Sequence, residues 1–191
     1  MSKPTRLVIF GRQGAGKGTQ CDRIVKNYGV IHLSTGDMFR AARDAETELG
    51  KEVGPIMQAG GLVPDDLTIG IVRERLAEAD VLEQGFVLDG FPRTPGQAEA
   101  LLEMLGANSL TAVVNLEVPL DEVTARMKAR GRADDTDEGI AKRLALYDQE
   151  TVPTINWFAD RGLVVNIDGY GTEDEVADRI FAAIDAAADA H

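Results

Sequence analysis

The residues with the clearest chemical potential lie in a glycine-rich stretch near the start of the chain. Residues 11–19 read GRQGAGKGT; the apolar run 7–10 precedes them, and residues 20–26 follow without glycine or proline. This order predicts a strand, a loop and a helix. Glycines let several backbone N–H groups turn toward one anion, and Lys17 and the helix N-terminus add positive charge. The stretch therefore predicts a phosphate-binding loop, with a glycine turn that binds nothing as the alternative.

An acidic and a basic residue further along the chain suit the same chemistry. Asp89 follows the apolar run 85–88. In phosphate-loop proteins a carboxylate at this point faces Mg²⁺ or its bound water, whereas the structural alternative is a turn-forming aspartate before Gly90. Arg93 comes four residues later. Because an arginine fork matches phosphate oxygens, Arg93 is a candidate phosphate ligand, with an ordinary surface arginine as the alternative.

Four arginines gather around one short turn. Arg126 and Arg130 are four residues apart and share a helix face, Arg132 lies in the turn 131–135, and Arg143 lies on the next helical segment. The formal net charge of the chain is −12, so a polyphosphate ligand requires a local basic cluster of this kind. We interpret the cluster as an anion clamp. The alternative is a solvated helix end whose arginines pair with neighbouring aspartates.

The elements that must position these residues alternate along the chain. The segments between apolar runs have apolar residues at helical spacing, and the runs themselves predict strands at 7–10, 30–33, 85–88, 111–116 and 163–167. This alternation predicts an α/β fold with a central five-stranded parallel sheet and helices on both faces. In such sheets ligands bind beyond the carboxyl ends of the strands. The candidate chemical residues follow the strands at that edge.

Two other segments have recognisable signals. Residues 172–175 read TEDE, a capping box that predicts the start of the last helix. Between Arg40 and Asp66 a mostly helical insertion ends in GGLVP at 60–64. Its glycines and proline suggest a hinge, so we expect the insertion to close over a bound substrate.

Composition limits the class of protein. The chain has 191 residues, of which 44% are hydrophobic and 27% charged, and this suits one globular domain. We expect no nucleic-acid or membrane partner, because the overall field is acidic. Cys21 is the single cysteine, and His32 and His191 are the two histidines, so zinc-site spacing is missing. We expect Cys21 and His32 to be packed core residues. Without a signal peptide or membrane span in the sequence, we expect a cytoplasmic protein.

Together the motifs resemble the adenylate kinase family. They are residues 11–20, LSTGDM at 33–38, GLVP at 61–64, LDGFPRT at 88–94 with Gln97, and the turn 130–135; they occur in the family's order, and Asp168-Gly169 extends the match to the last strand. The resemblance implies a monomeric P-loop kinase, with a single domain over 1–191, a helical AMP-binding flap at 34–63 and a short lid at 130–136. Only three residues separate Arg130 from Asp134, as in the short-lid form without zinc. Gln13 departs from the family, which often has proline there.

The resemblance also implies roles by matching position. The ATP site comprises Gly14, Ala15, Gly16, Lys17, Gly18, Thr19, Arg126, Arg130 and Gly171. The AMP site comprises Thr35, Arg40, Gly61, Leu62, Val63, Gly90, Arg93, Gln97, Arg132 and Arg143. The catalytic residues around the transferring group are Lys17, Arg93, Arg130, Arg132 and Arg143. Asp89 and Asp37 hold Mg²⁺ only through its waters, with no zinc site.

The implied reaction is the reversible, Mg²⁺-dependent transfer of the terminal phosphoryl group of ATP to AMP, which gives two ADP. The attacking phosphate oxygen is ionised at neutral pH, so no general base is needed. A kinase for UMP, CMP or GMP is an alternative, although Thr35 favours AMP because UMP/CMP kinases usually carry another small residue there. A non-catalytic nucleotide switch is the second alternative. A GTPase is disfavoured, because N-K-x-D is missing and the only D-x-x-G, at 168–171, comes too late.

Overall fold

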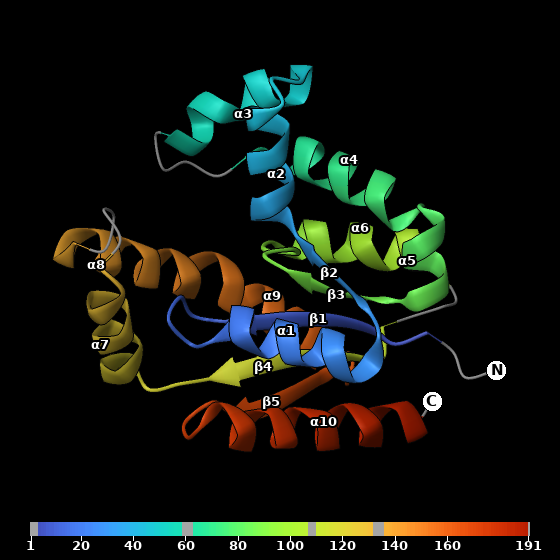
Figure 1. Ribbon diagram of the computed structural model, residues 1–191, viewed down its shortest axis with the longest axis vertical. Helices are drawn as coiled ribbons and strands as arrows, with labels where there is room; N and C mark the ends of the chain where they lie inside the picture. The colour runs from blue at the N-terminus through green and yellow to red at the C-terminus, as the bar shows by residue number, and fades with distance from the viewer. Residues whose placement is uncertain (1–3, 59–62, 107–109, 132–135, 191) are drawn as a thin grey trace.

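A parallel β-sheet forms the centre of the molecule (Figure 1). The computed structural model describes residues 4–58, 63–106, 110–131 and 136–190. The strands are β1 (Arg6–Gly11), β2 (Ile31–Ser34), β3 (Phe86–Asp89), β4 (Ala112–Glu117) and β5 (Val164–Asp168). They pair in the order β2-β3-β1-β4-β5, and every pair is parallel. The predicted five-stranded α/β architecture is therefore confirmed.

Four of the strands lie one residue later than the sequence predicts. Each includes one polar residue beyond its predicted end, namely Ser34, Asp89, Glu117 and Asp168. The backbones of these residues continue the ladder, with Ser34 opposite Asp89 and Glu117 opposite Asp168. An apolar run marks only the buried part of a strand, because backbone pairing does not depend on side-chain polarity. Asp89 is thus the last residue of β3 rather than the first residue of the following loop.

Helices cover both faces of the sheet and extend beyond its carboxyl edge. They are α1 (Lys17–Tyr28), α2 (Thr35–Asp44), α3 (Glu48–Gln58), α4 (Asp65–Leu76), α5 (Ala79–Gln84), α6 (Pro95–Leu105), α7 (Leu120–Arg130), α8 (Asp137–Leu146), α9 (Val152–Ala159) and α10 (Glu173–Asp189). A π-helical segment, η1 (Tyr147–Thr151), joins α8 to α9. Within the described part of the chain, no helix has the length and hydropathy needed to cross a bilayer.

The side chains of β1 alternate between two hydrophobic cores. Leu7 and Ile9 belong to the core that includes buried residues of α1, α7 and α10. Val8 and Phe10 belong to the opposite core, which includes buried residues of α4, α6 and α9. Successive side chains of a strand point to opposite faces, so a strand covered by helices on both sides is apolar throughout. This double burial explains why the apolar run before the glycine loop is continuous.

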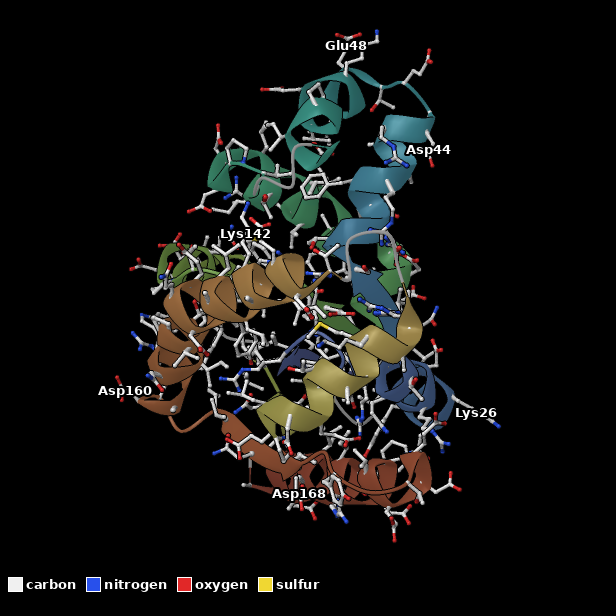
Figure 2. All side chains as sticks on the ribbon, turned by 90° about the vertical axis from the view of Figure 1, so that its left-hand side faces the viewer. Lys26, Asp44, Glu48, Lys142, Asp160 and Asp168 are labelled. Atoms are coloured by element: carbon white, nitrogen blue, oxygen red, sulfur yellow. The ribbon has the colours of Figure 1, made fainter. Side chains whose placement is uncertain are left out.

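Two pairs of helices extend from the carboxyl edge of the sheet. Figure 1 shows α2 and α3 rising from the end of β2, while α7 and α8 lie beside the loop that follows β1. The Ser34 hydroxyl caps α2 by accepting from the backbone N–H of Asp37, and Thr136 caps α8 in the same way. Figure 2, viewed from this edge, shows α7 and α8 in front of the sheet. The two pairs therefore flank the edge where ligands are expected.

The core predicts a large loss of stability from Ile180→Ala. Ile180 is 0% exposed and lies in α10, whose predicted capping box at Thr172 and Glu175 is confirmed. Removing the buried side chain should lower the free energy of unfolding by about 2–5 kcal/mol, because transfer and cavity costs add. Urea denaturation measures this loss. The matched control Asp178→Ala, on the exposed face of α10, should stay within about 0.5 kcal/mol of the original chain. Equal stability of the two variants would contradict the packing described.

Candidate active site

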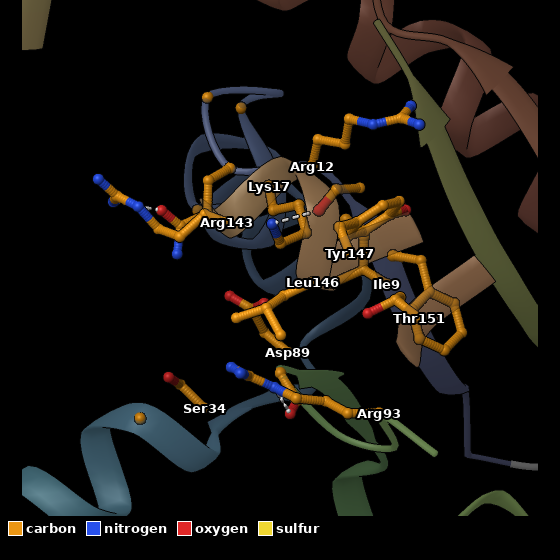
Figure 3. A pocket seen from close by; sticks show the side chains of 18 of the residues that line it. Ile9, Arg12, Lys17, Ser34, Asp89, Arg93, Arg143, Leu146, Tyr147 and Thr151 are labelled. Carbon is orange, nitrogen blue, oxygen red and sulfur yellow. Dashed lines mark hydrogen bonds between the residues drawn. The ribbon is translucent and has the colours of Figure 1, made fainter. Parts of the chain in front are cut away.

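A cavity of about 650 Å³ lies at the carboxyl edge of the sheet. Four parts of the chain line it: the glycine loop, the end of β2 with the start of α2, the end of β3 with the loop after it, and the helices from α7 to η1. Figure 3 shows Lys17, Asp89, Arg93 and Arg143 around this space. Among the predicted site residues, those that line the cavity are Gly14, Gly16, Lys17, Gly18, Thr19, Arg40, Asp89, Gly90, Arg93, Arg126, Arg130 and Arg143.

The glycine loop has the geometry of an anion cradle. Gly16 caps α1 in the left-handed conformation, with φ 94°, and no side chain caps this helix N-terminus. Its N–H groups therefore face the cavity without a competing side-chain acceptor. Gly14 also has a positive φ of 85°, and a Cβ there would lie 2.8 Å from the carbonyl oxygen of Val123 in α7. Glycine is required at position 14 both for its backbone conformation and for the close approach of α7.

Lys17 is the first residue of α1 and points back across the loop. Its ammonium donates a hydrogen bond of 2.7 Å to the carbonyl oxygen of Gly11 (Figure 3). Burial holds the pKa of Lys17 below its usual value, while the nearby Asp89 carboxylate acts in the opposite direction. A phosphate oxygen in the cradle would offer Lys17 a charged acceptor in place of a neutral carbonyl, and such charge-assisted bonds are about twice as strong.

Asp89, the last residue of β3, meets His32 of the adjacent strand β2. The Nε2 atom of His32 lies 3.5 Å from a carboxylate oxygen of Asp89. The Asp89 carboxylate raises the pKa of His32, against the opposite effect of burial. Burial alone would raise the pKa of Asp89, but His32 and Lys17 outweigh it and hold that pKa below its ordinary value. Asp89 is thus ionised at neutral pH. The expectation that His32 is a core residue is wrong, because its side chain is 26% exposed and borders a carboxylate.

A hydrogen-bonded network joins α2, β3 and α6 beside the cavity. The Arg93 Nε donates to the carbonyl oxygen of Gly90 at 2.9 Å, and the Thr35 hydroxyl donates to the same oxygen at 3.2 Å. The Gln97 amide oxygen accepts from the backbone N–H of Arg93 at 2.8 Å, while its nitrogen donates to Asp65 at 2.6 Å. Gly90 has a φ of 85°, and a Cβ there would lie 2.8 Å from the Thr35 hydroxyl. Thr35, Gly90, Arg93 and Gln97 therefore form one unit.

Helices α7 and α8 bring three of the four arginines of the predicted anion clamp to the cavity. The Arg126 Nε donates to Glu122 at 2.7 Å, and Arg126 also reaches the carbonyl oxygen of Gly14 at 3.5 Å. Arg143 donates to the side-chain oxygen of Gln13 at 2.7 Å (Figure 3). Arg130, at the end of α7, lines the same space. The glycine loop thus contacts both the helix before the predicted lid and the helix after it.

Several predicted site residues lie elsewhere. Thr35 and Gln97 are buried in the network behind the cavity lining, and Ala15 is buried in the core. Asp37 pairs with Arg40, which holds the pKa of Asp37 below its usual value. Val63 and Gly171 are outside the cavity lining. Three other predicted residues, Gly61, Leu62 and Arg132, lie outside the described residues.

The sequence gives no signal for part of the cavity wall. Arg12 donates to Asp148 at 2.6 Å, and its guanidinium carbon lies 5.0 Å from the centre of the Tyr147 ring. Tyr147 and Thr151 line the cavity from η1. A π-helical turn shifts which side chains share a helix face, and helical periodicity in the sequence does not reveal this shift. The position of Gln13 beside Arg143 is equally hidden, because the two residues are 130 positions apart.

Comparisons with known proteins identify the family of the chain. The family model described as Adenylate kinase matches residues 9–163. The chain belongs to the adenylate kinase family. The adenylate kinase of Stenotrophomonas maltophilia strain R551-3 is 44% identical over 185 residues, which cover 94% of this chain and 98% of that protein. The adenylate kinase of Kocuria rhizophila is 46% identical over 187 residues, covering 95% and 99%, and that of Leifsonia xyli subsp. xyli is 47% identical over 184 residues, covering 93% and 92%.

Residues 9–163, which match the adenylate kinase family model, include the residues that line the cavity but not all of the predicted ATP site. Residues 9–163 include the glycine loop, the Thr35 to Gln97 network and the arginines of α7 and α8. Gly171 follows β5 and lies beyond the matched range. Its left-handed φ of 132° fits glycine, and a Cβ there would lie 2.8 Å from the Glu175 side chain. Residue 171 is thus constrained locally by the start of α10.

The pairing of His32 with Asp89 predicts a defined pH dependence. In protein without nucleotide or metal, the His32 ring should titrate above pH 6.5, because the Asp89 carboxylate favours the imidazolium. Its folded-state pKa is raised, so this pair stabilises the fold fully below the unfolded-state pKa and loses that effect as pH rises through the folded-state pKa. NMR titration measures the shift, with His32→Gln identifying the resonance. In Asp89→Asn the His32 pKa should fall; an unchanged pKa would contradict the pairing.

Proposed function

We propose that this chain transfers the terminal phosphoryl group of ATP to AMP, reversibly and with Mg²⁺, to give two ADP. ATP:AMP phosphotransfer is the activity of the adenylate kinase family, to which the chain belongs. The observation that carries the proposal is the single cavity in which a phosphate loop faces arginines from both sides. A site that only bound one nucleotide would not need cations on both sides of the loop.

The ATP end of the proposed site is the glycine loop with α7. The amides of residues 14–19 hold the phosphates together with Lys17. Arg126 lies over the ATP adenine, a role supported by its contact with the Gly14 carbonyl oxygen and its place in the cavity lining. Gly171 contributes backbone near the base. Arg130 and Arg143 contact the transferring group from the other side of the loop. For Arg143, a phosphate oxygen would replace the Gln13 side-chain oxygen as one of its acceptors.

The AMP end of the proposed site is the unit formed by Thr35, Gly90, Arg93 and Gln97. Arg93 and Arg40 bind the AMP phosphate, since both line the cavity and an arginine fork suits a dianion. Thr35 and Gln97 act on the adenine side by fixing the backbone of the Gly90 loop. Gly61, Leu62 and Val63 complete the AMP pocket, and Arg132 joins the arginines around the transferring group.

The proposed mechanism consists of alignment and charge stabilisation. Phosphoryl transfer passes through a loose transition state whose charge lies on the equatorial oxygens. Lys17, Arg93, Arg130, Arg132 and Arg143 oppose that charge. Arginine suits the role because its planar fork binds two oxygens and stays protonated. The attacking AMP oxygen is already ionised, so no side chain needs to remove a proton.

The residues present fit a magnesium ion held through water. Asp89 lines the cavity near Lys17 and is ionised at neutral pH, and Mg²⁺ prefers oxygen ligands while keeping several waters. When bound with ATP, the ion neutralises phosphate charge. Asp89 orients its waters, whereas Asp37 acts less directly because it pairs with Arg40. The zinc-bound lid of the long form has no counterpart in this proposal.

The proposed domain organisation is one kinase domain over residues 1–191, with a flap at 34–63 and a short lid at 130–136. Closure of the flap and the lid would exclude water from the transferring group. We further propose a cytoplasmic monomer with ATP, AMP and ADP as its only partners. The acidic net charge of −12 supports the absence of nucleic-acid and membrane partners.

Acceptor choice is the direct test of the proposed reaction. ADP formation is measured from Mg·ATP with AMP, UMP, CMP, GMP or no acceptor. We expect kcat/KM for AMP to exceed that for each other acceptor by at least about tenfold, because a pocket that hydrogen-bonds the edge of adenine leaves its polar groups unpaired with another base. If UMP or CMP served as well as AMP, the kinase for those nucleotides would replace the proposal. Slow hydrolysis independent of any acceptor would favour the nucleotide switch.

The role of Lys17 predicts a large kinetic loss in Lys17→Ala. Losing a half-buried cation beside the transferring phosphates should lower kcat/KM by about a hundredfold or more. Lys26→Ala is the matched control, because Lys26 lies in the same helix and is exposed; its kcat/KM should stay within about twofold. Circular dichroism checks the fold of both variants. Near-normal turnover of folded Lys17→Ala would refute the assigned site.

A further inference from the structure

Three metal-binding side chains meet beneath the cavity. Cys21 from α1, His32 from β2 and Asp89 from β3 each offer one ligand atom, and these three atoms all lie within 4.8 Å of one another. Cys21 and His32 are 11 positions apart, and His32 and Asp89 are 57 positions apart, so no short sequence motif marks the cluster. We propose that Cys21, His32 and Asp89 form a binding site for one thiophilic divalent cation, such as Zn²⁺, and that its occupation competes with the use of Asp89 by Mg·ATP.

The donor set suits such a cation. Zinc sites with three protein ligands combine cysteine sulfur, histidine nitrogen and carboxylate oxygen at about 2.0–2.3 Å from the metal, with water in the fourth position. Tetrahedral geometry then places the ligand atoms about 3.5 Å apart. In the protein the three ligand atoms are up to 4.8 Å apart. They have to approach one another by only about an ångström, which side-chain rotation can provide. A thiolate, a carboxylate and a neutral imidazole also balance the charge of a divalent ion.

One atom of the cluster lacks a partner that a metal would supply. The His32 Nε2 is buried and has no hydrogen-bond partner within the described residues. The Asp89 oxygen 3.5 Å away is too distant for a good hydrogen bond. A buried ring nitrogen without a partner is costly. Because the side chains of His32 and Asp89 are 26% and 19% exposed, an ion can approach from their side although Cys21 is fully buried.

The surrounding charges act in both directions. Asp22 and Asp37 add negative potential at His32, whereas Lys17 and Arg93 add positive potential at Asp89. The Cys21 thiol is protonated, because burial and then Asp89 raise its pKa. Metal binding therefore has to release that proton to the buffer, and a coordinated dication does so by stabilising the thiolate. Thiolate and imidazole ligands select Zn²⁺ or Cd²⁺ over Mg²⁺, which prefers oxygen.

The shared carboxylate makes this site antagonistic to the proposed active site. Asp89 bound directly to a metal cannot orient the waters of Mg²⁺, and the metal neutralises the carboxylate charge that raises the pKa of the neighbouring Lys17. Linkage makes the effect reciprocal, so bound Mg·ATP also weakens metal binding at the cluster. Metal binding itself does not rest on the proposed function and can be measured without nucleotide.

Cadmium titration tests the site in the full-length, metal-free chain. Cys21 is the only cysteine, so the ultraviolet charge-transfer band of a cadmium–thiolate reports its ligation. We expect one saturable equivalent per chain, displaced by Zn²⁺ but not by an excess of Mg²⁺. His32→Gln and Asp89→Asn should each weaken the affinity at least about tenfold. Two control variants should bind cadmium as tightly as the original chain does. They are His191→Gln, which removes the other imidazole, and Asp178→Asn, which removes an exposed carboxylate.

Two further readouts separate a folded-state site from a reactive thiol. Cadmium should raise the Tm, because a ligand of the native state stabilises it by mass action; a lowered Tm would mean binding to the unfolded chain and would overturn the proposal. Equal affinity of His32→Gln, Asp89→Asn and the original chain for cadmium would overturn it as well.

In ADP-forming assays, His32→Gln should need at least about tenfold more Zn²⁺ than His191→Gln for half inhibition. If the chain had no kinase activity, the spectroscopic titration would still decide the metal site.

Discussion

Parallel pairing of β1 with β3 is the constraint on which the rest of the site depends. Ile9 lies opposite Asp89 in this ladder, and β2 places Ser34 opposite the same Asp89. The glycine loop, the start of α2 and the loop after β3 therefore leave the sheet side by side. In parallel sheets all carboxyl ends share one edge, so residues far apart in sequence gather there. The apolar double burial of β1 fixes this register, since a slip of one residue would exchange its two core faces.

The cations of the cavity differ in the acceptors that hold them. Lys17 and Arg93 donate to the neutral oxygens of Gly11 and Gly90. Arg126 and Arg40 instead pair with the carboxylates of Glu122 and Asp37. A phosphate that replaces a neutral acceptor gains a charge-assisted bond, whereas one that replaces a carboxylate gains little. Lys17 and Arg93 are therefore the better placed for tight phosphate contact, and the carboxylate pairs orient Arg126 and Arg40.

Local patterns explain what the sequence could predict. The glycine loop, the strands and the Thr172 capping box each depend on residues within a few positions, and the structure confirms these elements. The His32 contact with Asp89 depends on the lateral order of β2 and β3, which periodicity does not encode. The contact of Gln13 with Arg143 is likewise set by packing of the glycine loop against α8, and the π-helical turn at Tyr147 is not encoded in helical periodicity. The sequence therefore indicated that the chain binds phosphate. Which groups contact the charged residues of the site could be learned only from the fold.

Two glycines tie the flanking helices to the sheet edge. At Gly14 the backbone of α7 comes so close that a Cβ would lie 2.8 Å from Val123, and at Gly90 it would lie 2.8 Å from the Thr35 hydroxyl of α2. Both glycines also need a positive φ of 85°, so a larger residue would meet backbone strain as well as a steric clash. The helices that carry the arginines are thus anchored at the two loops proposed to bind phosphate. If the proposed flap and lid close, we expect either helix pair to turn about these anchors, which would keep Lys17 and Arg93 in place while the arginines of α7 and α8 approach them.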